Sequence, residues 1–133
     1  MKLINKLISD PGYLVLPIPN MKKFTQLKNK FVNRIGKNKN IDQLRKDLSR
    51  MSKSEINKTM IKLLSFNNAS DLMLEACKDI VKEISGKKIF IQRRANIIFN
   101  LPGEEQRRQW PHYELMSGIS PYTFVMWAPF HDL

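Results

Sequence analysis

The chain has 133 residues, about the size of one domain, and 42% of them are apolar, which is typical of a globular protein and argues against wholesale disorder. Its formal net charge is +11, and because no stretch approaches eighteen apolar residues, we expect no membrane span. The apolar run at the start is broken by Asn5 and Lys6, which does not fit a signal peptide. The single cysteine, Cys77, cannot form an internal disulfide, so we predict a cytoplasmic protein.

The positive charge is concentrated in the first half of the chain. Residues 1–70 hold 15 lysines and arginines against 4 aspartates and glutamates, whereas residues 71–133 hold 8 against 8. The positive charge of residues 1–70 is suited to bind a polyanion: nucleic acid, an acidic membrane surface or a phosphate-rich substrate. The alternative is a lysine- and asparagine-rich composition that puts charges on any solvated face, because the basic residues form no contiguous block.

The first elements in chain order are a turn, a strand and a helix. Residues 10–12 (Asp-Pro-Gly) predict a turn, and residues 13–16 predict a short strand that two prolines end. Residues 21–35 predict an amphipathic helix that ends at Gly36. Its apolar positions are Phe24, Leu27, Phe31 and Ile35. Residues 37–40 form a polar loop, which is the best candidate for a disordered linker.

Three further helices are predicted by their capping residues. Asn40 can cap the first, residues 52–55 (Ser-Lys-Ser-Glu) match a capping box for the second, and Ser70 can cap the third, with Gly86 after its end. The residues that we expect to face inward are Leu44, Leu48 and Met51, then Ile56, Met60, Leu63 and Leu64, then Met73, Cys77, Ile80, Val81 and Ile84.

The character of the sequence changes at Lys87, where β-branched and aromatic residues become frequent. The segments that predict strands or extended backbone are 89–92, 96–101, 110–114 and 122–128. We therefore predict one α+β domain over residues 1–133, with 1–86 mainly helical and 87–133 mainly strands.

One pair of residues, His112 and Glu114, suggests a metal site. In an extended strand, residues two apart project from the same face, so His112 and Glu114 would aim at one point. An imidazole and a carboxylate supply two of the three protein ligands of a 2-His-1-carboxylate iron site. His131 is a poor third ligand, because it lies so soon after Glu114 in the chain. A hydrogen-bonded pair on a strand surface is the ordinary alternative for an isolated His-x-Glu.

In order and spacing, these segments resemble the N-terminal part of the phytanoyl-CoA dioxygenase family, the Fe(II)- and 2-oxoglutarate-dependent oxygenases. Residues 110–114 (Trp-Pro-His-Tyr-Glu) stand where the family has its His-x-Asp. Residues 127–133 (Trp-Ala-Pro-Phe-His-Asp-Leu) resemble its Trp-x-Pro-hydrophobic-x-Asp strand. Residues 10–16 and 94–102 resemble its opening strand and the strand that leads to the metal motif.

The resemblance implies the first strands of an incomplete double-stranded β-helix, a jelly-roll or cupin-like fold. It also implies Fe(II) bound by His112 and Glu114, 2-oxoglutarate as co-substrate, and a small organic molecule as the substrate that is oxidised. Glu114 stands where aspartate is usual. The distal iron-binding histidine and the arginine that binds 2-oxoglutarate would lie beyond Leu133, so we expect a truncated fragment that is inactive alone.

The competing hypothesis is a non-enzymatic basic module. In this interpretation residues 22–62 bind nucleic acid or another polyanion, and the affinity falls steeply as salt is added.

Overall fold

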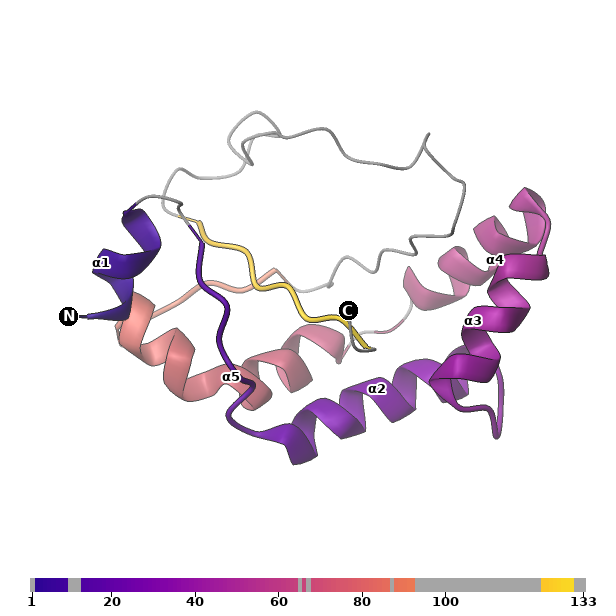
Figure 1. Ribbon diagram of the computed structural model, residues 1–133, viewed down its shortest axis with the longest axis horizontal. Helices are drawn as coiled ribbons and strands as arrows, with labels where there is room; N and C mark the ends of the chain where they lie inside the picture. Colours follow the sequence, from indigo (N-terminus) through magenta and orange to yellow (C-terminus); the bar gives the residue numbers. More distant parts are fainter. Residues whose placement is uncertain are drawn as a thin grey trace.

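The computed structural model describes residues 2–9, 13–64, 66, 68–86, 88–92 and 123–130. Its helices are α1 (Leu3–Ile8), α2 (Met21–Ile35), α3 (Ile41–Arg50), α4 (Lys53–Leu64) and α5 (Ala69–Ser85), as Figure 1 shows. Helices account for 64% of the described residues, and none of these residues belongs to a strand. The predicted α+β class, with the first strands of a double-stranded β-helix, is therefore wrong for this part of the chain.

The predicted strands that fall on described residues are extended segments instead. Residues 13–16, 89–92 and the described part of 122–128 have no strand assignment. β-Branched and aromatic residues favour an extended backbone, but a strand also needs a partner that completes its hydrogen-bond ladder. Here residues 123–130 place alternate side chains on the helices, with Phe124, Met126, Ala128 and Phe130 half-buried against them. The predicted turn at 10–12 and strand at 96–101 lie outside the described residues.

The predicted helix starts are largely confirmed. The Asn20 side chain accepts a hydrogen bond from the Lys23 backbone N–H at 3.2 Å, which caps α2. Asn40 and Gln43 form a reciprocal capping box at the start of α3, with distances of 2.8 and 3.0 Å. These bonds satisfy backbone N–H groups that have no partner within the helix.

Two details differ from the predictions. α5 begins at Ala69 with Asn68 in the cap position, so Ser70 is not its cap. The loop 37–40 is a short connection rather than a linker, because Lys39 forms an ion pair with Asp47 of α3. At the far end of α5, Gly86 has φ +77°, a conformation that glycine adopts without steric cost.

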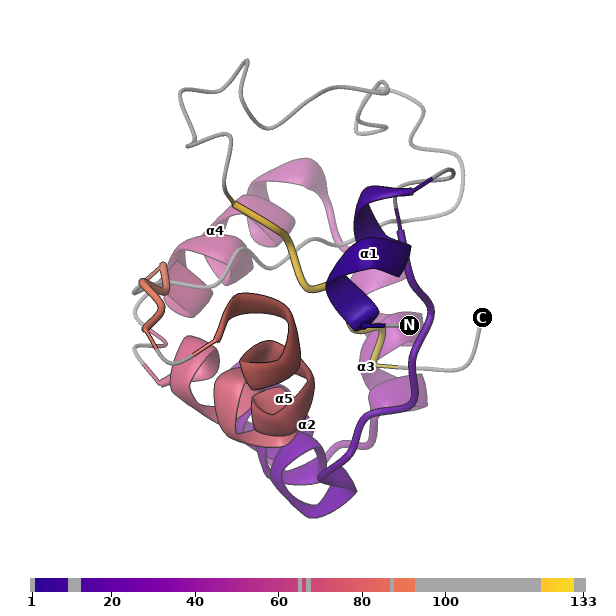
Figure 2. The same cartoon turned by 90° about the vertical axis from the view of Figure 1, so that its left-hand side faces the viewer.

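The core consists of two apolar clusters that share α2. Phe24 and Leu27 pack with buried residues of α5, whereas Phe31 and Val32 pack with Leu44, Leu48 and Leu63 of α3 and α4. Phe130 joins the clusters, because its ring centroid lies 5.7 Å from that of Phe24 and 4.8 Å from that of Phe31. The inner face of α2 is thus packed against the core from Phe24 to Val32, and Figure 2 shows α2 lying beside α5.

A kink in α5 positions the start of α2. Cys77 has a non-helical backbone (φ −116°, ψ 15°), and the preceding carbonyl of Ala76 accepts a hydrogen bond from the Asn20 backbone N–H at 3.0 Å. Cys77 is buried, as predicted, and burial raises the pKa of its thiol. Beside the kink, Lys23 of α2 forms an ion pair with Glu75 of α5. These contacts fix how α2 lies on α5.

Candidate nucleic-acid interface

The predicted iron ligands His112 and Glu114 lie outside the described residues, as does His131. Among the described residues, no group of three histidines, cysteines, aspartates or glutamates could hold a metal ion. The Fe(II) site and its co-substrate 2-oxoglutarate therefore stay predictions. The incomplete β-helix on which they depend is not found in the part of the chain that the structure describes.

The charge that the sequence places in the first half belongs to one set of helices. Residues 21–64, which form α2 to α4 and their connections, hold 13 lysines and arginines against 3 aspartates and glutamates, a surplus of ten positive charges. The net charge of α5 is negative, because this helix holds 2 lysines against 4 acidic residues. These acidic residues are all exposed and recur at every fourth position: Asp71, Glu75, Asp79 and Glu83. The fold thus separates a basic part from a mildly acidic helix.

Helix α2 has basic and neutral polar side chains on the side that faces away from the core. Its fifteen residues include five lysines and arginines and no acidic residue. Because its apolar positions face the two core clusters, the opposite side carries only polar side chains. Its exposed residues there are Lys22, Thr25, Gln26, Asn29, Lys30 and Asn33. We call this set the outer face of α2.

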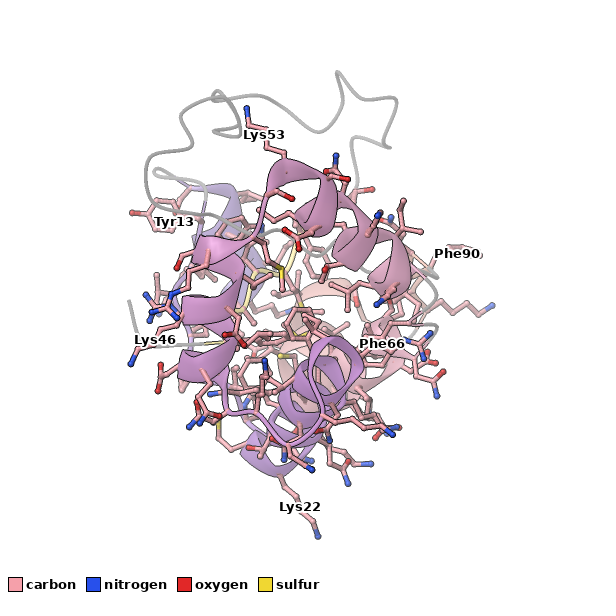
Figure 3. All side chains as sticks on the ribbon, turned by 90° about the vertical axis from the view of Figure 1, so that its right-hand side faces the viewer. Tyr13, Lys22, Lys46, Lys53, Phe66 and Phe90 are labelled. Carbon is pink, nitrogen blue, oxygen red and sulfur yellow. The ribbon has the colours of Figure 1, made fainter. Side chains whose placement is uncertain are left out.

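The basic side chains of α2, α3 and α4 do not lie in one plane. Figure 3 shows Lys22 of α2, Lys46 of α3 and Lys53 of α4 pointing in three different directions. Of the three basic helices α2, α3 and α4, α2 alone contains no acidic residue. Among the basic helices, α2 is therefore the best candidate for a continuous contact surface.

Two of the lysines form ion pairs with carboxylates of the same chain. Lys23 lies 2.5 Å from a carboxylate oxygen of Glu75, and the ion pair holds the pKa of Glu75 below its usual value. Lys39 pairs with Asp47. Lys22 and Lys30 make no ion pair with any carboxylate that the structure describes. These two lysines of the outer face are therefore accessible to an external partner.

The start of α4 contains the third capping interaction. The Ser52 hydroxyl donates a hydrogen bond to a carboxylate oxygen of Glu55 at 2.7 Å, and the Ser52 backbone N–H donates to the same oxygen at 2.8 Å. Because both bonds favour the charged carboxylate, the side-chain bond more than the backbone one, they lower the pKa of Glu55. Ile56 and Leu63 on the inner side of α4 are buried as predicted.

This lowered pKa predicts an acid-sensitive start of α4. A carboxyl group whose pKa is lower in the folded state stabilises the fold above its unfolded-state pKa, and this stabilisation is lost as the pH falls through the folded-state pKa. Replacing Ser52 with alanine removes the hydroxyl hydrogen bond, which lowers the pKa of Glu55 more than the backbone bond does. The pKa of Glu55 should therefore rise. An NMR titration of the side-chain carboxyl measures it, with Ser54→Ala as the control. An unchanged Glu55 pKa in Ser52→Ala would show that the bond does not form in solution.

Comparisons with protein-family models, with curated proteins and with solved structures found no match to this chain. None of the helices in the described part is long and apolar enough to cross a bilayer. The interface is therefore assigned from its own charges and geometry alone.

Proposed function

We propose that this chain binds nucleic acid, with the helices between residues 22 and 62 contacting the phosphate backbone. The observation that carries the proposal is the outer face of α2, which is basic, exposed and free of acidic residues. Lysines that neutralise phosphates release the counterions condensed on the nucleic acid, and this release supplies most of the sequence-independent affinity.

The placement of the charges favours a ligand over simple solvation. Lys22 lies in the first turn of α2, where the positive end of the helix dipole makes a cation unfavourable. This arrangement costs stability in the free protein, and a bound polyanion relieves it.

The proposal is tested by titrating the protein into a fluorescently labelled duplex of about 20 base pairs at several salt concentrations. We expect the logarithm of the binding constant to fall linearly with the logarithm of the salt concentration, with a slope of about −0.9 for each phosphate contacted. Fluorescence anisotropy measures both quantities. A protein that fails to bind at about 50 mM salt, or whose affinity does not respond to salt, would refute electrostatic binding to nucleic acid.

A further inference from the structure

The outer face of α2 also indicates which form of nucleic acid fits. We propose that α2 enters the major groove of duplex DNA, where its amide side chains contact base edges while its lysines contact the phosphates on either side. This inference rests on the proposed nucleic-acid binding. It adds which helix enters the nucleic acid, α2, and which form of nucleic acid is bound, duplex DNA.

The amides form a row between the lysines. Gln26, Asn29 and Asn33 follow one another at spacings of three and four residues, so they are neighbours on one side of the helix. Lys22 precedes the row by one turn, and Lys30 lies beside it. A phosphate-binding helix needs only the lysines, so the row of amides calls for a separate explanation.

These amides are available for an external partner. Gln26, Asn29 and Asn33 are exposed, and none of their amide side chains hydrogen-bonds to another residue in the described part of the chain. Asparagine is also a weaker helix former than alanine, lysine or glutamate, so the two asparagines lower the stability of α2. An amide can donate and accept at once, which matches the N6 donor and N7 acceptor of adenine in the major groove.

The dimensions and position of α2 suit the groove. Its fifteen residues span about 22 Å at 1.5 Å per residue, and the major groove of B-form DNA, about 12 Å wide, admits an α-helix. Figures 1 and 2 both show α2 along one edge of the molecule, with α5 on its inner side. The helix can therefore approach a duplex without first separating from its core contacts.

Other polyanions fit this face less well. Single strands are bound mainly by stacking bases on aromatic rings, but both phenylalanines of α2 are buried. Duplex RNA has a major groove too narrow for side chains to read. A lipid surface would require several apolar residues to insert beside the lysines. All six residues of the outer face are polar, and Met21 at the helix start is the one large apolar residue of α2 that is exposed.

The test compares the wild-type protein with a triple variant, Gln26→Ala, Asn29→Ala and Asn33→Ala, and with the control Asn5→Ala at an exposed position of α1, outside the proposed contact region. Alanine favours helix, so the triple variant should fold. Circular dichroism checks this. The ligands are a pool of duplex DNA with random central base pairs, the same pool as single strands, the corresponding duplex RNA, and vesicles of acidic phospholipid. Affinity, its salt dependence and the sequences of the bound duplexes are measured.

We expect the wild-type protein and the Asn5→Ala control to bind duplex DNA at least about tenfold more tightly than single strands or duplex RNA. They should also enrich adenine at fixed positions in the bound pool. The triple variant should lose both the enrichment and most of the preference for duplex DNA, while its salt slope stays the same.

Equal binding to all three nucleic acids without enrichment would overturn the groove assignment and leave the proposed function intact. The same holds if the triple variant keeps the wild-type preference and enrichment. Binding to none of the nucleic acids, or to vesicles alone, would overturn both.

Discussion

Replacing Phe31 with alanine should lower the free energy of unfolding by about 3–5 kcal/mol, which is typical for the truncation of a buried aromatic residue. The Phe31 side chain is only 3% exposed, packs in the cluster formed by α2, α3 and α4, and contacts the ring of Phe130. A loss of this size is a large share of the stability of a domain of this length. Urea unfolding followed by circular dichroism measures it.

The matched control for this prediction is Asn33→Ala, two residues further along the same helix but on its outer face. It removes no core contact and introduces a better helix former, so its effect should stay within about 0.5 kcal/mol. Similar losses for the two variants would mean that the inner and outer faces of α2 are wrongly assigned.

The helical part of the fold could be predicted because its signals are local. Asn40, Ser52 and Gly86 each mark a helix end by the chemistry of the cap itself. The apolar spacing then assigned the inner faces. By contrast, α1 was not predicted, because its six residues are too few to show a clear helical period.

The strands could not be predicted reliably, because strand formation depends on a partner elsewhere in the chain. In residues 123–130 alternate side chains are half-buried, with Phe124 and Phe130 turned toward the core. This alternation suits a strand, and it equally suits an extended segment that packs on helices. Nothing within these eight residues distinguishes the two cases, and their β-branched and aromatic side chains favoured the wrong prediction.

The candidate interface was only partly visible in the sequence. The charge imbalance of the first half pointed to residues 22–62, yet the basic residues looked scattered. Packing of Phe24, Leu27 and Phe31 against the core shows which side of α2 remains exposed. That orientation places Lys22 and Lys30 on one surface with the amides between and beside them.

The double variant Lys22→Gln and Lys30→Gln should bind nucleic acid more weakly and with a shallower salt dependence. Each lysine that contacts a phosphate contributes about 0.9 to the salt slope, so the slope should shrink by about 2. The matched control is Lys78→Gln with Lys82→Gln on α5, which removes the same charge from exposed positions. If contact with phosphates were only a consequence of net charge, the two variants would behave alike.

The salt slope of these two double variants on the same duplex is therefore the deciding measurement. A slope reduced by about 2 in the α2 variant and unchanged in the α5 variant is the expected result. Equal slopes in both variants, whether reduced or unchanged, would contradict the assignment of nucleic-acid contacts to the outer face of α2.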